Sequence, residues 1–288
     1  MNPKYKQIVE KELLRLDQLG WNEPITDSDE SSENVKSLII SFPSKLFEEE
    51  DNGYDSLFNR HRSHGIIDFA KKWNVDLIWE IGAGNGQISQ NLIEHGINVI
   101  AVEPLIAGVK KLNSLSIHTY IGTLNLLKLP SESIKAIGIF DVLEHIERPI
   151  PFLEEINRVL EPGGYLFTTV PAGQYLFSNF DLSIGHFRRY SKIQLKKQLD
   201  LCGFETKSIK YQFFILILPV FILRRIPYLL NKKIDTENIH EKNKDHKIFV
   251  NYFNRIMGLI LRLESKTKLP IGFSLSALSV KKTQKLPK

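Results

Sequence analysis

Short apolar runs alternate with amphipathic stretches through the middle of this 288-residue chain. The apolar runs predict strands at 76–82, 98–104, 117–122, 136–142 and 164–171. Helical spacing of apolar residues predicts helices at 86–96, 107–115, 151–160 and 191–203. Because parallel neighbours need crossover connections, this alternation predicts an α/β fold with a mainly parallel sheet and helices on both faces.

The pattern changes on both sides of this region, and we divide the chain at the changes. Residues 1–73 predict an N-terminal helical extension or cap, and residues 74–211 the α/β core. Residues 212–272 form an apolar and basic insert that we expect to be helical. Residues 273–288 supply the last strand of the core and a basic tail, and 204–212 is the expected partner strand.

Composition narrows the class of protein only slightly. Hydrophobic residues make up 42% and charged residues 25%, which fits a sizeable globular domain, and a formal net charge of +5 does not by itself imply nucleic acid. A single cysteine, Cys202, excludes an intrachain disulfide and favours a reducing cytoplasm. We expect no signal peptide and no spanning helix, because the N-terminus is charged and no apolar run is long enough to span a membrane. We also expect no metal site, because the histidines show no H-x-x-x-H spacing.

Three glycines stand within residues 82–86, directly after the first predicted strand. Open α/β sheets bind ligands at the carboxyl ends of their strands, where such a turn allows close backbone approach. Gln87 stands where a dinucleotide fingerprint needs glycine, and the chain lacks the G-K-[ST] of phosphate loops. Glu103 ends the second strand, and its carboxylate can accept both ribose hydroxyls. The alternative for Glu103 is a solvated strand end.

On these residues the chain resembles the class I S-adenosylmethionine-dependent methyltransferases, in the group with the type 11 methyltransferase domain. "WEIGAGNGQ" is similar to their glycine-rich motif, and "VIAVEP" to the acidic end of their second strand. "FDVLEHIERPIPFLEEINRVLEPGGYLFTTVPA" is similar to their fourth strand, following helix and fifth strand. The resemblance implies a Rossmann-like seven-stranded mixed sheet whose antiparallel last strand is "SLSALSVKK". It also implies an enzyme that uses S-adenosyl-L-methionine as methyl donor.

The resemblance assigns roles in binding the cofactor. The glycine loop would hold the methionine part, with Glu80 on its amino group, and Glu103 would bind the ribose. Residues after the third and fourth strands would line the adenine and the floor of the site, although Thr123 stands where relatives often carry an acidic residue. The cofactor-binding residues expected are Glu80, Gly82, Ala83, Gly84, Asn85, Gly86, Glu103, Pro104, Thr123, Leu124, Asp141 and Val142.

Two segments are candidates for the methyl acceptor side. His145 and His186 are candidate general bases, needed only if the acceptor carries a proton at neutral pH. Glu144 and the basic cluster "GHFRRY", with Arg188, Arg189 and Tyr190, are candidate acceptor-binding residues, because paired arginine hydrogen bonds suit an anion. Alternatively, Glu144 and His145 steady their loop, and the arginines neutralise carboxylates and fix theirs.

The apolar insert bears on the kind of acceptor. "FFILILPVFIL" is followed directly by Arg224 and Arg225, a pattern that fits a peripheral contact with an anionic membrane or a lid of paired helices. Both interpretations allow a small-molecule, lipid-linked or glycan acceptor and a cytoplasmic or membrane-associated protein. The rival functions are a non-catalytic methyltransferase-like binding module and a nucleic-acid methyltransferase. Residues 141–146 lack the N-P-P-[FY] of base amino methylation, and no obligate protein partner is evident.

Overall fold

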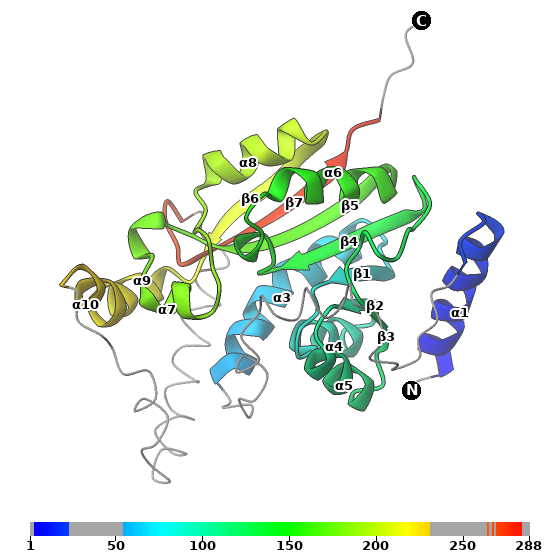
Figure 1. Ribbon diagram of the computed structural model, residues 1–288, viewed down its shortest axis with the longest axis horizontal. Coiled ribbons are helices and arrows are strands. Elements are labelled where there is room, and N and C mark those ends of the chain that lie inside the picture. The colour runs from blue at the N-terminus through cyan, green and yellow to red at the C-terminus, as the bar shows by residue number, and fades with distance from the viewer. Residues whose placement is uncertain (1–2, 23–53, 231–263, 265–266, 268, 284–288) are drawn as a thin grey trace, which may run out of the picture.

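A central seven-stranded sheet organises the molecule (Figure 1). The computed structural model describes residues 3–22, 54–230, 264, 267 and 269–283. The strands are β1 (Leu77–Ile81), β2 (Asn98–Glu103), β3 (His118–Ile121), β4 (Ile134–Phe140), β5 (Leu160–Pro171), β6 (Phe204–Gln212) and β7 (Ser274–Lys281). The α-helices are α1 (Pro3–Gln18), α3 (Tyr54–Lys72), α4 (Gln87–Glu94), α5 (Ile106–Ser114), α6 (Pro149–Val159), α7 (Asn179–Ser183), α8 (Lys192–Leu201), α9 (Ile217–Val220) and α10 (Ile226–Leu229).

The strand order is β3-β2-β1-β4-β5-β7-β6. Neighbours from β3 to β5 pair in parallel, and β7 pairs antiparallel with both β5 and β6. This arrangement confirms the predicted seven-stranded mixed sheet, its antiparallel last strand and the pairing of that strand with residues 204–212. The order reverses between β1 and β4, which is where sheets of this kind hold their ligands.

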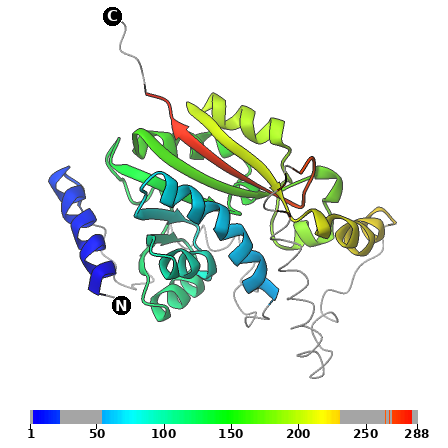
Figure 2. The ribbon, with the colours of Figure 1, turned by 180° about the vertical axis from the view of Figure 1, so that it is seen from behind.

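Helices cover both faces of the sheet because each contributes one apolar stripe. Side chains of α1, α6 and α8 share one core with Trp79, Ile137 and Leu166. Side chains of α3 and α4 share a second core with Ile78 and Phe167, and α5 packs beside it. Figure 2 shows α3 on the face turned away from the viewer in Figure 1. The predicted division of the chain into four segments stays a prediction. The last of these segments supplies β7 to the sheet.

One strand begins earlier than predicted. β5 starts at Leu160 rather than near residue 164, because Leu160 already pairs with Ile134 of β4. The register then shifts before Ala136 pairs with Tyr165, and Gly163 takes the left-handed conformation with φ 79°. The residues between, which read as a turn in the sequence, therefore form an irregularity inside the strand.

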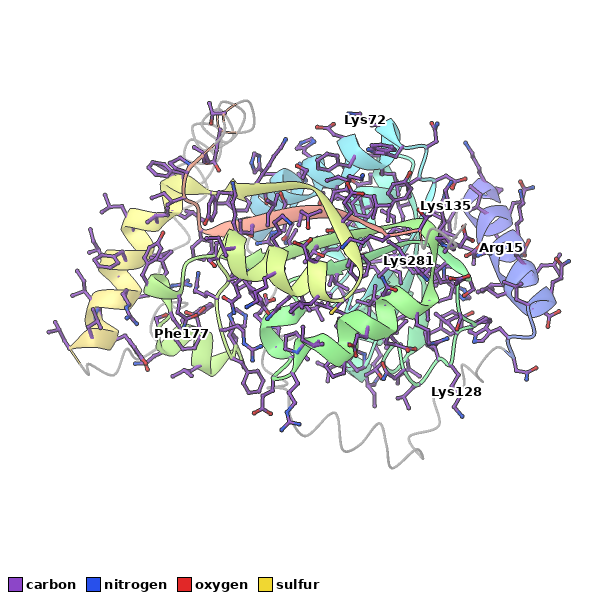
Figure 3. The ribbon with its side chains drawn as sticks, turned by 90° about the horizontal axis from the view of Figure 1, so that it is seen from above. Arg15, Lys72, Lys128, Lys135, Phe177 and Lys281 are labelled. Carbon is purple, nitrogen blue, oxygen red and sulfur yellow. The ribbon has the colours of Figure 1, made fainter. Side chains whose placement is uncertain are left out.

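The apolar insert forms a continuous helical stretch of mixed type over residues 214–229, at the end of the molecule opposite α1 (Figure 3). Arg225 donates a 2.5 Å hydrogen bond to the carbonyl of Phe177, and the Arg224 guanidinium lies 3.8 Å from the ring centroid of Phe180. Within the described residues, no helix is long and apolar enough to cross a membrane. The acidic segment 25–34, the second apolar stretch 256–263 and most of the basic tail lie outside those residues.

Candidate functional site

A pocket of about 310 Å³ lies at the carboxyl ends of β1, β2 and β4, next to the reversal in strand order. It is lined by Asn59, Arg62, Glu80, Gly82, Ala83, Gly84, Asn85, Gln87, Ile88, Glu103, Pro104, Leu105, Phe140, Asp141, Val142, His145 and Ile146. Most of the predicted cofactor-binding residues therefore come together here, with His145 among them. Another hollow, of about 430 Å³, lies between α1 and the amino ends of β1 and β4, the edge that such sheets do not use for ligands.

The glycine loop turns sharply because its glycines adopt positive φ. Gly82 has φ 75° and Gly84 has φ 58°, and the Gly82 amide donates to the Val102 carbonyl at 2.7 Å. A Cβ on Gly82 would stand 2.8 Å from Val142 Cγ2, so the loop approaches the end of β4 as closely as the backbone allows. Gly86 instead faces Leu112 of α5, and it does not line the pocket.

Glu103 is 3% exposed and held by backbone amides on both sides. Gly84 donates its amide to Oε2 at 2.8 Å, and Leu105 donates to Oε1 at 2.9 Å. Burial raises the pKa of the Glu103 carboxyl, while these two hydrogen bonds act to lower it. Each oxygen keeps a further lone pair for an incoming donor, so the carboxylate is oriented to accept two adjacent hydroxyl groups.

Glu80 is buried at the base of the same loop and accepts a hydrogen bond from the Ser89 hydroxyl. Burial, with the charge of Glu103 as a smaller cause, raises the pKa of Glu80 to about 8. The side chain is therefore protonated at neutral pH unless a cation comes next to it. A ligand with an ammonium group would supply that cation, and this fits the predicted role of Glu80.

Asp141 follows β4 in a left-handed conformation with φ 56°, which is strained for a residue other than glycine. Two contacts of the Asp141 carboxylate hold this backbone conformation. Thr169 donates its hydroxyl to Oδ1 at 3.0 Å, and Arg62 of α3 forms an ion pair with Oδ2 at 2.5 Å. Arg62 reaches the pocket from outside the predicted core, and Asn59, one turn before it, donates to the Gln87 side chain.

The polar lining residues that were not predicted from the sequence are Arg62, Asn59 and Gln87. Arg62 and Asn59 lie on one helix face at a spacing of three residues, a pattern shared by countless surface helices. Gln87 was noted only because it is not glycine. Nothing in the local pattern indicates that α3 crosses to the carboxyl end of the sheet, because that position depends on packing against α4.

The two predicted bases lie next to each other. The rings of His145 and His186 are 4.6 Å apart between centroids and nearly perpendicular, at 77°. His145 lines the pocket, whereas Glu144 and His186 are not among the lining residues. Burial, followed by the charge of His186, lowers the pKa of His145 to about 4. His145 is therefore a neutral imidazole at physiological pH, and the burial that keeps it neutral also makes it a weak base.

The remaining residues of the "GHFRRY" cluster contact the protein itself. Arg189 is 2% exposed and forms an ion pair with Asp181 at 2.7 Å. Tyr190 is fully buried and donates its hydroxyl to the Leu143 carbonyl at 3.2 Å, while Arg188 donates to the Glu147 carbonyl at 2.7 Å. These contacts favour the alternative in which the cluster fixes its loop, and the acceptor-binding role stays a prediction.

Thr123 and Leu124, expected near an adenine, do not line the pocket. Leu124 is fully buried in the core shared with Trp79. The Thr123 carbonyl accepts the amide of Leu126, which closes the turn after β3. The apolar lining of the pocket comes from Leu105 and Ile146 instead, so an adenine ring is expected to pack against these two side chains.

Comparison with known proteins matches residues 79–168 to a family model described as a methyltransferase domain. Among curated proteins, one from Mycobacterium tuberculosis H37Rv, named an uncharacterized methyltransferase, is 30% identical over 91 residues, which are 31% of this chain and 37% of that protein. A probable S-adenosylmethionine-dependent methyltransferase from Mycolicibacterium smegmatis is 32% identical over 90 residues, which are 30% of this chain and 35% of that protein. The match thus spans little more than a third of these relatives' length.

Solved structures resemble the fold over a longer stretch. A putative sarcosine dimethylglycine methyltransferase from Galdieria sulphuraria is 12% identical with a TM-score of 0.52, covering 87% of this chain and 99% of that one. A possible histamine N-methyltransferase from Thermotoga maritima is 19% identical with a TM-score of 0.50, covering 83% of this chain and 99% of that one. At these identities the likeness concerns the fold alone.

Proposed function

Because the chain belongs, through residues 79–168, to the class I S-adenosylmethionine-dependent methyltransferases, we propose that it binds S-adenosylmethionine in the pocket and methylates an acceptor beside His145. The observation that supports this most strongly is the pair formed by Gly84 and Glu103. The amide-held carboxylate accepts ribose hydroxyls, and the loop before it leaves room for the rest of the cofactor.

The residues present also fit the charges of the cofactor. Glu80 is a buried carboxylate without a cationic partner among the described residues, so an ammonium group placed against it would restore its charged form. Arg62 lines the pocket near the end of β4, and beside its ion pair with Asp141 its guanidinium has further N–H donors for a carboxylate. An amino acid moiety carries both groups.

The chemistry requires mainly positioning. When bound, the cofactor supplies a methyl group on a sulfonium, which is already an excellent leaving group. The protein holds the acceptor close and in line, which supplies most of the acceleration. For an acceptor that carries a proton, His145 would accept it as a weak base, because its imidazole lines the pocket.

Calorimetric titration of S-adenosylhomocysteine tests cofactor binding without knowledge of the acceptor. We expect one site with a dissociation constant in the micromolar range. Transfer of labelled methyl groups to fractionated small molecules, glycans and lipids then identifies the acceptor and separates an enzyme from a binding module. Absence of binding by a monodisperse protein would contradict the proposal, and label appearing in nucleic acid would redirect it.

Among acceptors, the helical stretch 214–229 favours a lipid-linked molecule or one delivered at a membrane surface. Its side chains include apolar ones that lie open, with Leu218 and Leu223 each 67% exposed. Exposed apolar side chains on a helical stretch fit insertion at a membrane interface. Arg224 and Arg225, however, pack on residues 177–180 and so also fit a lid held in place by these contacts.

Co-sedimentation with anionic vesicles distinguishes the two roles of this stretch. If Leu218 and Leu223 enter the membrane, replacing both by glutamate should leave the protein in the supernatant. Replacing Arg224 and Arg225 by glutamine should loosen the packing on residues 177–180 and change binding less. Wild-type protein that stays in the supernatant at low salt would leave the stretch as a lid.

A further inference from the structure

Three potential metal ligands converge behind the pocket, from two segments far apart in the sequence. Glu144 and His145 belong to the short helical turn after β4, and His186 follows α7. One donor atom from each lies within 4.8 Å of the other two. We propose that Glu144, His145 and His186 form a binding site for a divalent transition-metal ion such as Zn²⁺. The argument for this site does not rest on the proposed methyl transfer, although the two share His145.

Glu144 gives the first reason. The residue is fully buried, and within the described part of the chain neither carboxylate oxygen has a hydrogen-bond partner. An unpaired buried carboxylate is costly, so it takes up a proton or binds a cation. Its place is fixed nevertheless, because the Phe187 amide donates to the Glu144 carbonyl at 2.8 Å and Tyr190 holds the preceding carbonyl. The fold thus presents the carboxylate at a defined position without satisfying it.

His186 gives the second reason, through its orientation. Its Nδ1 lies 3.2 Å from Oδ1 of Asp181, and Asp181 is in turn held by Arg189 Nε at 2.7 Å and by the Ser178 amide at 2.9 Å. Metal-binding histidines commonly donate their second ring nitrogen to a carboxylate in this way. The bond to Asp181 leaves Nε2 directed toward Glu144.

The distance between His186 Nε2 and Glu144 Oε1 is 3.8 Å, too long for a hydrogen bond. It suits two atoms that share an ion. With zinc at about 2.1 Å from each ligand, tetrahedral ligand atoms stand about 3.4 Å apart, and wider angles increase that separation. The third ligand atom lies within 4.8 Å of the other two, so a shift of at most about 1.4 Å completes the site.

His145 completes the set and connects it to the pocket. Its imidazole offers a ring nitrogen within the same cluster of donor atoms. Two imidazoles and one carboxylate are the ligands of several catalytic zinc sites, and imidazole selects transition metals over magnesium. Because His145 also lines the pocket, a bound ion would lie beside the place proposed for the acceptor.

The competing interpretation needs no metal. A protonated His186 between Glu144 and Asp181 would form a buried charge network, and the alternating charges would account for the same distances. The two interpretations differ in what happens when Glu144 becomes a neutral amide. Loss of a ligand abolishes metal binding, whereas a purely protonic network has no metal binding to lose.

Metal-stripped full-length protein titrated with ZnCl₂ tests the proposal. We expect one equivalent to bind, MgCl₂ not to compete, and Co²⁺ to give the visible absorption of a tetrahedral site. Glu144→Gln should weaken Zn²⁺ binding by more than about 100-fold, and Asp181→Asn by about 10- to 100-fold through the second ring nitrogen of His186. His64→Ala, which removes an exposed histidine beside His95, is the matched control and should bind as wild type.

Thermal unfolding keeps the test decisive if a variant is altered in stability. Zn²⁺ should raise the wild-type melting temperature and leave that of Glu144→Gln unchanged, while metal-free Glu144→Gln should melt at or above the wild type. Unchanged Zn²⁺ binding in Glu144→Gln, or no stoichiometric binding by the wild type, would overturn the proposal. Cofactor titrations run in parallel on metal-free protein show separately whether the proposed methyltransferase site is intact.

Discussion

Glu103 and Glu144 are both buried carboxylates beside one pocket, and their surroundings differ. The Glu103 carboxylate accepts one backbone amide on each oxygen, whereas the Glu144 carboxylate accepts no hydrogen bond within the described residues. The first is oriented before any ligand arrives, so cofactor binding there requires little reorganisation. The second depends on a proton or a cation from elsewhere. One end of the pocket is thus complete in the protein alone, and the other is completed by what binds to it.

The largest effect is expected from breaking the completed end. Gly84→Val places a branched side chain at φ 58° and disturbs the amide that orients Glu103. We expect S-adenosylhomocysteine affinity to fall by more than about 100-fold by calorimetry. Gly20→Val carries the same penalty at φ 81° beyond α1 and is the control. Equal binding by both variants would place the cofactor site elsewhere.

A smaller loss should follow from changing only the acceptor capacity of the completed end. In Glu103→Gln, an amide NH₂ must face one of the two backbone amides that the carboxylate now accepts. We expect cofactor affinity to fall about 10- to 100-fold, the usual range for an unsatisfied polar group. Glu94→Gln, on the exposed end of α4, should bind normally. Undiminished affinity in Glu103→Gln would argue against a ribose role.

The pH dependence of stability should report on Glu80. Its folded pKa of about 8 lies above the ordinary value of 4.5, so between these values the folded protein holds more protons than the unfolded chain. Stability therefore falls as pH rises through that window, by up to about 1.4 kcal/mol per pH unit. Glu80→Gln should lose this slope in cofactor-free thermal melts from pH 5 to pH 8. Parallel slopes for the two proteins would show that Glu80 does not carry the proton.

The smallest effect concerns the anchoring of the Glu144 turn. Tyr190→Phe removes the hydroxyl that the Leu143 carbonyl accepts. We expect the free energy of unfolding in urea to drop by about 0.5–1.5 kcal/mol, because the Leu143 carbonyl loses this hydrogen bond and keeps only the one from the Ile146 amide. Tyr175→Phe, at an exposed tyrosine, should change it little. An unchanged free energy of unfolding in Tyr190→Phe would remove the structural role and favour contact with the acceptor.

The contrast also shows how far local sequence patterns reach. The glycine loop and Glu103 were predictable because each needs only its own strand end, and parallel strands bring those ends together. Burial of Arg189 and Tyr190 was not predictable, since arginine next to tyrosine is normally read as polar surface. Arg62 was missed because its contact with Asp141 depends on how α3 packs across the sheet. Thr123 and Leu124 were placed by analogy with relatives, and Leu124 lies in the core instead.

The position of β7 has a consequence for the order of folding. β6 ends at Gln212 and β7 begins at Ser274, yet β7 lies between β5 and β6 in the sheet. During synthesis, β6 therefore has no neighbour to pair with until the later strand has left the ribosome. Pairings of such long sequence separation form slowly and leave earlier strands with open edges. We expect nascent chains that stop before residue 274 to be the ones that require a chaperone.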